Sequence, residues 1–217
     1  MRDFPVFTTQ YGIASLTLRE IPYRQAAYIR LGEMDPKYHL EHLKECMDFC
    51  RMAGAEKIYA TGHALVETCP LDSVLVEMRG RAWVDPEKMA NVFPVTETTA
   101  GLWRQIYNRR MKAVPHAATL EARQEKDLWQ GVGAYFVHWQ GELLGIGWLE
   151  DTKLLALASE KPGSGERVLH TLMSLAEGAD MTLEVASGND RAIALYERAG
   201  FLKTRELTRW YRVDGTF

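Results

Sequence analysis

The sequence lacks the features that mark membrane, secreted and nucleic-acid-binding chains. No apolar run among its 217 residues approaches the length of a membrane span, and the start, Met1 to Phe7, has none long enough for a signal peptide. The net charge of −3 offers DNA or an anionic membrane no overall attraction. We therefore expect a cytoplasmic protein that has neither a nucleic acid nor a membrane as its partner.

Cysteine is scarce as well, and three cysteines fit reduced thiols better than a disulfide framework. Cys46 and Cys50 lie one helical turn apart near His39 and His42, but this spacing matches none of the usual zinc patterns. Cys50 also falls on an apolar helical stripe, where buried free cysteine is common. We expect no metal site.

The composition that is present, 47% hydrophobic and 25% charged, is that of a globular protein with one large domain or two small ones. The apolar pattern breaks around Val84 to Lys88, so we place a boundary near residue 88, between an N-terminal α/β subdomain (1–88) and a second domain (89–217). In the first, the spacing predicts strands at 13–19, 25–31, 57–61 and 73–78 and a helix that begins at Asp35-Pro36 and stops at Gly54. In the second, it predicts strands at 92–95, 133–139, 142–149, 153–158 and 181–186 and helices at 99–111, 119–127, 166–177 and 190–199.

A glycine-rich turn opens the predicted helix at 166–177. It presents unpaired backbone amides at the positive end of a helix dipole, which makes Gly163, Ser164, Gly165 and Glu166 a potential anion cradle. Alone, such a turn is also a plain connection between a strand and a helix.

The most informative stretch, Leu183 to Phe201, reads as strand, tight turn and helix. Asn189 suits the helix N-cap, and Gly200 sits where a helix ends in a left-handed residue. Tyr196 follows Asn189 by seven residues, two turns along the same helical face. A polar cap and a phenol are therefore expected to line one groove.

The pattern L-E-V-x-x-x-N-x-x-A-I-x-L-Y-x-x-x-G-F in this stretch resembles the C-terminal motif of the GNAT superfamily of acyl-CoA N-acyltransferases. It is closest to the motif of the enzymes that acetylate N-terminal amines of ribosomal proteins. The resemblance covers about residues 90–213 and implies a GNAT fold, with a mixed, mostly antiparallel sheet flanked by helices. It also implies acetyl-CoA as co-substrate, with Asn189 and Tyr196 facing coenzyme A. The order of helix, turn and strand from His39 to His63 echoes the second domain, so we interpret residues 1–88 as a degenerate GNAT half.

The glycine-rich turn stands where GNAT proteins hold the pyrophosphate of coenzyme A. The family's motif begins with Arg or Gln three residues before its first glycine, and this chain has Glu160 there. A carboxylate that faces a diphosphate is unfavourable, so binding requires the Glu160 side chain to point to solvent. Lys161 is the candidate replacement for the missing cation.

Acyl transfer from a thioester to an amine needs a held carbonyl, a neutral amine and a proton for the departing thiolate. Tyr196 is the candidate proton donor, because the reference pKa of a phenol lies above that of a thiol. The resemblance carries a general-base role onto Glu184, although strand alternation equally makes Glu184 a solvent-facing residue. Glu150 or a chain of water molecules is the reserve. The groups expected to hold the pantetheine arm are the amides of Leu155, Ala156 and Leu157 and the side chain of Asn189.

The sequence thus predicts an N-acetyltransferase that moves the acetyl group of acetyl-CoA to a primary amine of a small molecule or a peptide, as a monomer or homodimer. Two other functions stay open: a non-catalytic acyl-CoA-binding or regulatory protein, favoured by Glu160, and a purely structural partner-binding protein. The acceptor is not identified, but the residues expected to select it lie in the first helical region of the second domain and include Tyr107, Arg109, Arg110, His116 and Trp129.

Overall fold

The computed structural model describes residues 5–131 and 133–216, which pack as two compact units. One unit holds residues 5–74 together with 208–216, and the other holds residues 75–207. The predicted boundary near residue 88 falls inside the second unit. Residues 1–4, 132 and 217 lie outside the described part, and with them the beginning of the N-terminal segment considered above. Within the described residues, every helix is too short or too polar to span a bilayer.

The first unit is a small mixed sheet covered by one long helix. Strands β1, β2 and β3 form an antiparallel meander, β4 joins β3 in parallel, and the end of β11 pairs with β4. Helix α2 buries Leu43, Met47 and Cys50 against this sheet, as its apolar stripe predicts. Its elements are β1 (Val6–Thr9), β2 (Gly12–Thr17), α1 (Ile21–Arg24), β3 (Ala26–Met34), α2 (His39–Met52), β4 (Lys57–Thr61) and η1 (Ala64–Thr68).

The second unit is built on a larger sheet, in the order β11-β5-β10-β9-β8-β7-β6. Strands β6 to β9 pair antiparallel in sequence and β5 pairs antiparallel with β10, whereas β9 and β10 pair in parallel. The predicted mixed, mostly antiparallel sheet is confirmed. Its elements are β5 (Leu71–Arg81), η2 (Pro86–Lys88), β6 (Asn91–Pro94), α3 (Ala100–Met111), η3 (Ala122–Gln124), α4 (Glu125–Gln130), β7 (Ala134–Trp139), β8 (Glu142–Glu150), β9 (Lys153–Ser159), α5 (Gly165–Met173), η4 (Ser174–Ala176), β10 (Asp180–Ala186), α6 (Asp190–Arg198) and β11 (Leu202–Arg212).

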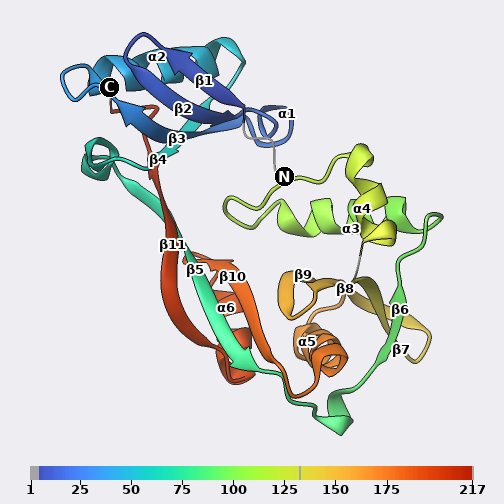
Figure 1. Cartoon of the computed structure of the whole chain (residues 1–217). Coiled ribbons are helices and arrows are strands. Elements are labelled where there is room, and N and C mark those ends of the chain that lie inside the picture. The colour runs from blue at the N-terminus through green and yellow to red at the C-terminus, as the bar shows by residue number, and fades with distance from the viewer. Residues whose placement is uncertain (1–4, 132, 217) are drawn as a thin grey trace. The chain divides into compact units, whose positions relative to one another are not determined.

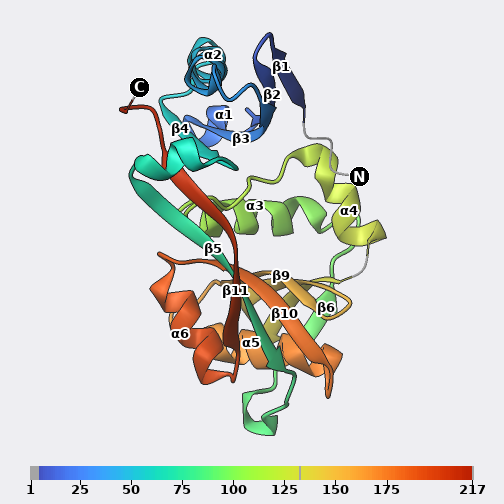
Figure 2. The same ribbon diagram turned by 60° about the vertical axis from the view of Figure 1, so that its left-hand side comes forward.

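Helices cover both faces of this larger sheet (Figures 1 and 2). On one face, α5 and α6 bury an apolar cluster that includes Leu169, Leu172 and Phe201. On the other, α3 and α4 form a second cluster around Trp103 and Leu128. Each large side chain removed from water in this way contributes about 1.5–3 kcal/mol. The two clusters fix the strands from both sides and so hold the ends of β9 and β10 in place.

Helix α2 begins later than predicted, at His39 rather than at Asp35-Pro36. The Asp35 carboxylate instead accepts a hydrogen bond from the amide of Lys37, at 2.9 Å. An aspartate can close a local turn in the same way that it caps a helix, and here the turn prevails.

A β-bulge separates the ends of β9 and β10. Trp148 of β8 pairs with Ala156 and Leu149 pairs with Leu154, which leaves Leu155 of β9 without an opposite residue. Such a bulge bends its strand and increases its twist. Strand β10 accordingly pairs with β9 only near the start of β9, through residues 182–183 opposite 153–154. Beyond Leu154, the β10 side of β9 has no strand partner among the described residues.

Candidate active site

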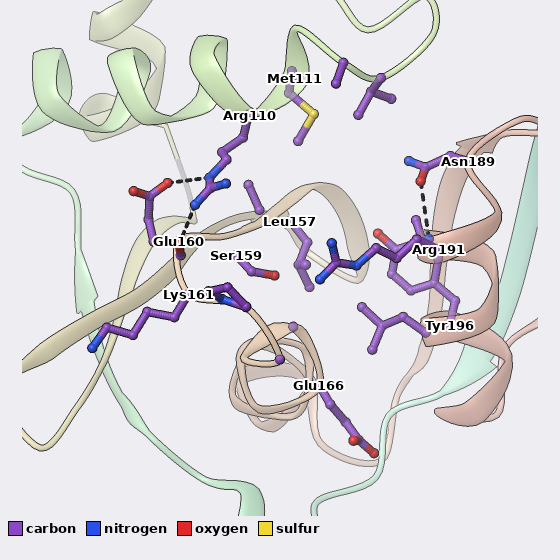
Figure 3. A pocket seen from close by; sticks show the side chains of 18 of the residues that line it. Arg110, Met111, Leu157, Ser159, Glu160, Lys161, Glu166, Asn189, Arg191 and Tyr196 are labelled. Atoms are coloured by element: carbon purple, nitrogen blue, oxygen red, sulfur yellow. Dashed lines mark hydrogen bonds and ion pairs between the residues drawn. The ribbon is translucent and has the colours of Figure 1, made fainter.

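A cavity of about 570 Å³ lies beside the C-terminal end of β9. Its walls come from the end of β9, the loop that enters α5, the length of α6 and the C-terminal end of α3 with the residues that follow it (Figure 3). The cavity brings together most of the residues that the sequence singled out. The predicted cofactor and catalytic residues that line it are Leu157, Lys161, Gly163, Gly165, Glu166, Asn189 and Tyr196, and Arg110 and Glu160 line it as well.

Four of the predicted site residues do not line the cavity. Leu155 is the bulged residue of β9, and Ala156 is buried in the core beneath α3. The Ser164 hydroxyl turns inward and donates to the carbonyl oxygens of Leu144 and Lys161, at 2.8 Å each. Ser164 therefore shapes the loop from within. The fourth, Glu184, lies on β10.

The loop before α5 has the form expected of an anion cradle. Gly163 adopts a left-handed φ of 80°, and no side chain caps the helix that begins at Gly165. The amides of Gly165 and Glu166 donate to no group within the described residues. They stay available at the positive end of the helix dipole. The Glu166 carboxylate points away from them and pairs with Lys88 at 2.8 Å, which lowers the pKa of Glu166.

Glu160 does not point into free solvent, as cofactor binding was expected to require. Its carboxylate accepts from Arg110 Nε at 2.7 Å and from Arg109 Nη2 at 2.5 Å, and its backbone carbonyl accepts from Arg110 Nη2. Partial burial raises the pKa of Glu160, but the two guanidinium groups lower it by more than burial raises it. The pKa of Glu160 therefore lies below its ordinary value. The negative charge that seemed unfavourable is compensated by α3, fifty residues earlier in the chain.

Lys161 lines the cavity but forms an ion pair with Glu142 of β8. Figure 3 shows its side chain extended away from Tyr196 and Asn189. Its role as the replacement cation stays a prediction, and it would require Lys161 to leave Glu142.

Helix α6 presents the two residues that the motif predicted to share a groove. The Asn189 side chain caps the helix by accepting from the amide of Ala192, at 3.3 Å. Tyr196 is 8% exposed, lines the same cavity, and packs near Phe201. Burial raises the pKa of Tyr196 to about 12. Its hydroxyl makes no hydrogen bond to any residue that the structure describes.

Two arginines of α6 were missed by the sequence analysis. Arg191 and Arg198 both line the cavity, and Figure 3 shows Arg191 pointing from α6 toward its centre. Both side chains are free of ion pairs with the described residues. Their spacing carried a usable signal, because Arg191, Leu195 and Arg198 recur at intervals of four and three and therefore share one face of α6.

Glu184 is exposed on β10 and forms an ion pair with Lys153 of β9, at 2.5 Å. Its partner across the sheet is Glu77 of β5. Hydrogen bonds from Arg79 and Arg205 lower the pKa of Glu77 to about 2. The predicted base thus stands in a charged cluster on the sheet and outside the cavity that Tyr196 lines.

The residues expected to select the acceptor divide into two groups. Arg110 lines the cavity and Arg109 supports it through Glu160. Tyr107 stacks on Trp103, and Trp129 packs against the core beside α3. These two aromatic residues, like His116, do not line the cavity. The part of the chain that the structure describes holds no group of three or more metal-ligating side chains.

No protein-family model matches the chain. N-alpha-acetyltransferase RimI of Mycobacterium tuberculosis (strain ATCC 25618 / H37Rv) is 43% identical to it over 53 residues, which are 24% of this chain and 34% of that protein. The match therefore spans about a third of the length of this curated relative.

Solved structures extend the likeness to nearly the whole chain. A GCN5-related N-acetyltransferase from Sphaerobacter thermophilus has a TM-score of 0.56 at 12% identity, over 93% of this chain and 76% of that one. A functionally unknown conserved protein from Staphylococcus epidermidis ATCC 12228 has a TM-score of 0.60 at 10% identity, over 97% of this chain and 93% of its own. At these identities the likeness defines the fold, which is the GNAT fold. The resemblance to the GNAT superfamily, with a motif close to that of RimI, is confirmed.

Proposed function

We propose that this chain is an acetyl-CoA-dependent N-acetyltransferase that acts on a primary amine of a small molecule or a peptide. One observation carries the proposal: the helix entrance at Gly163–Gly165, the unpaired edge of β9 and the helix face from Asn189 to Tyr196 surround a single cavity. The GNAT fold and the match to RimI support an N-acetyltransferase in general. A volume of about 570 Å³ is within the usual range for a cofactor site.

In this proposal the cofactor binds mainly through backbone groups. The amides of Gly165 and Glu166 take its phosphates, because they are unpaired and lie at a helix N-terminus. The pantetheine arm lies along the open edge of β9, at Leu155 to Leu157, where the β-bulge has removed the strand partner. Asn189 contacts the arm from the opposite wall.

The reaction forms a C–N bond and breaks a C–S bond, and the proton that the amine loses balances the proton that the thiolate gains. Tyr196 donates this proton to sulfur. Burial, which raises the pKa of its phenol to about 12, keeps the donor protonated at every working pH. A base takes the proton that the attacking amine loses, and the phenol regains a proton from solvent.

Glu184 is the base in this proposal. Its carboxylate is exposed, and it would have to exchange Lys153 for the incoming ammonium group. A water chain from the cavity to solvent fulfils the same need without a carboxylate. Glu184→Gln separates the two: thiol release should fall strongly if Glu184 is the base and should change little if a water chain carries the proton.

Thiol release tests the proposal directly. The native protein is incubated with acetyl-CoA and a panel of amines that includes peptide N-termini, lysine and polyamines, and free thiol is followed with a chromogenic disulfide. The protein's own thiols contribute little, because all three are buried and burial raises the pKa of Cys46 to about 12 and that of Cys50 to about 11. Amine-dependent thiol release supports the proposal.

Tight coenzyme A binding without thiol release from any amine would instead support a non-catalytic acyl-CoA-binding protein. The absence of coenzyme A binding would overturn both and leave a structural, partner-binding role. A cytoplasmic location, a monomeric or homodimeric state and the lack of a nucleic-acid partner stay predictions.

A further inference from the structure

Beside the glycine-rich loop before α5, the guanidinium groups of Arg109 and Arg110 share the single carboxylate of Glu160. The two lysines of this loop region each have a carboxylate of their own. Lys161 is matched by Glu142, and Lys88 is matched by Glu166 and Asp85. Arg109 and Arg110, in contrast, have only Glu160 between them. This group therefore leaves a net positive charge on the α3 side of the cavity, opposite Arg191 of α6, which is unpaired within the described residues.

The geometry also leaves Arg110 with unused donors. A guanidinium carries five N–H groups. Arg110 gives Nε to the Glu160 carboxylate and one Nη2 hydrogen to the Glu160 carbonyl. Three N–H groups stay without a partner in the described structure, while the side chain lines the cavity. Figure 3 shows Arg110 reaching from α3 down to the loop, on the opposite side from Arg191.

We propose that Arg110 is a phosphate-binding residue of the cofactor site and that Glu160 is its positioning residue. This inference rests on the proposed function. Arg110 supplies from α3 the cation that the loop itself lacks, and Glu160, held also by Arg109, fixes the guanidinium in one orientation. The ligand class is a phosphorylated thiol carrier, bound through its phosphate oxygens.

Several physical reasons favour this role for Glu160 over simple repulsion. The Glu160 side chain is 18% exposed and bonded at both oxygens, so its charge is already compensated by two cations. Because Glu160 already holds two nitrogens of the Arg110 guanidinium, the arginine has less rotamer freedom left to lose when it binds an anion. Arginine also binds phosphate through paired N–H groups, which suits the three donors that remain.

Calorimetric titration of the full chain with coenzyme A, at low and at high NaCl, tests the proposal. We expect Arg110→Ala to weaken binding about 10- to 100-fold at low salt and to flatten the dependence of affinity on salt. Arg123→Ala is the matched control, because Arg123 also pairs with a nearby glutamate, at 2.5 Å, but lies outside the cavity. It should bind as the native chain does. Arg110→Lys keeps the charge without the fork and should lose less than Arg110→Ala.

Glu160→Gln gives the second test, because a positioning role and a repulsive role for Glu160 predict opposite changes in coenzyme A affinity. If Glu160 positions Arg110, removing its charge weakens coenzyme A binding several-fold, although the site becomes more positive. If it merely repels phosphate, the same change strengthens binding, and the positioning role is overturned.

The outcomes also separate this inference from the function on which it rests. A native chain that does not bind coenzyme A overturns both. A native chain that binds while Arg110→Ala keeps its affinity and its salt dependence overturns this inference alone. A loss of affinity in Arg110→Ala that is equal at all salt concentrations would assign Arg110 a structural role and overturn it too.

Discussion

The two units contain the same succession of elements, but the parallel strands separate in only one of them. In each, three antiparallel strands lead through a helix to a strand that joins the third in parallel: β1 to β4 with α2 in the first unit, and β7 to β10 with α5 in the second. Strands β3 and β4 stay paired over five residue pairs. Strands β9 and β10 part after two. The interpretation of the first unit as a degenerate GNAT half stays a prediction, to which this order gives support.

Two local differences accompany the contrast. Both strands that precede the helix are bulged, but Leu155 comes directly after the two residues of β9 that pair with β10, whereas the irregularity of β3 lies at residues 32–33, beyond its five pairs with β4. The second unit also has a glycine-rich loop after this strand. In the first unit, the segment between β3 and α2 is Asp-Pro-Lys-Tyr, which has no glycine and turns on the Asp35 carboxylate. The entrances of α2 and α5 are alike in lacking a side-chain cap, so the separation of the parallel strands is what distinguishes the unit that has the cavity.

Tyr196→Phe is expected to have the largest effect. Thiol release should fall about 100- to 10,000-fold, because a general acid typically contributes that much. Coenzyme A binding should change little, since the phenol only loses its hydroxyl. Stopped assays of thiol release beside calorimetry measure both. Full activity in this variant would show that the open cavity does its chemistry without Tyr196.

Gly163→Val should come next, with Gly178→Val as its control. Both glycines have a left-handed φ, 80° and 77°, and a Cβ at either would meet nothing within 4 Å. Each substitution should therefore cost a similar strain, about 1–3 kcal/mol in the free energy of unfolding. Only Gly163 lines the cavity, so only its variant should also weaken coenzyme A binding. Equal binding in the two variants would separate the loop from the site.

The two helix caps offer a smaller comparison, one in each unit. Asn189 accepts from the Ala192 amide at 3.3 Å, and His63 accepts from the Leu65 amide at 3.1 Å. Alanine at either position should lower the free energy of unfolding by about 1 kcal/mol. We expect Asn189→Ala alone to weaken coenzyme A binding, as measured by titration. A matching loss in His63→Ala would attribute the effect to lowered stability and not to a contact of Asn189 with the cofactor.

The smallest effect concerns the ionisation of buried phenols. Burial raises the pKa of Tyr196 in the second unit to about 12, and it also raises the pKa values of Tyr28 and Tyr59 in the first. Because the folded pKa of Tyr196 exceeds its unfolded value of about 10, its contribution to stability is complete below pH 10 and is lost as pH rises toward 12. The tyrosinate absorbance is measured against pH in the native chain and in Tyr196→Phe. The difference between the two curves, which reports Tyr196 alone, should have its midpoint far above pH 10. A midpoint near 10 would mean that the phenol is exposed.

Local pattern was sufficient for most of the fold. The alternation in β10, the helical spacing of α6 and the cap at Asn189 are all within a few residues of one another, and each prediction is confirmed. The cavity lining by Asn189 and Tyr196 follows from the same short stretch. Local pattern misled at Asp35, where turn and helix cap use the same carboxylate chemistry.

What sequence reasoning missed depends on residues far apart in the chain. Arg110 meets Glu160 across 50 positions, and Lys153 meets Glu184 across 31. Nothing near Glu160 indicates that its charge is compensated, so local reasoning could treat it only as a repulsive group. The sequence around Leu155 likewise does not indicate a bulge, because neither glycine nor proline occurs there.

The bulge has a consequence for how this protein can vary. Main-chain groups along the separated part of β9 lack a neighbouring strand, so a ligand with amides of its own can complete the ladder in that strand's place. Binding of this kind depends on main-chain hydrogen bonds and not on the identity of the side chains. Exchanges at Leu155 or Leu157 that keep the register should therefore be tolerated, whereas the removal of one residue from this strand would erase the docking edge.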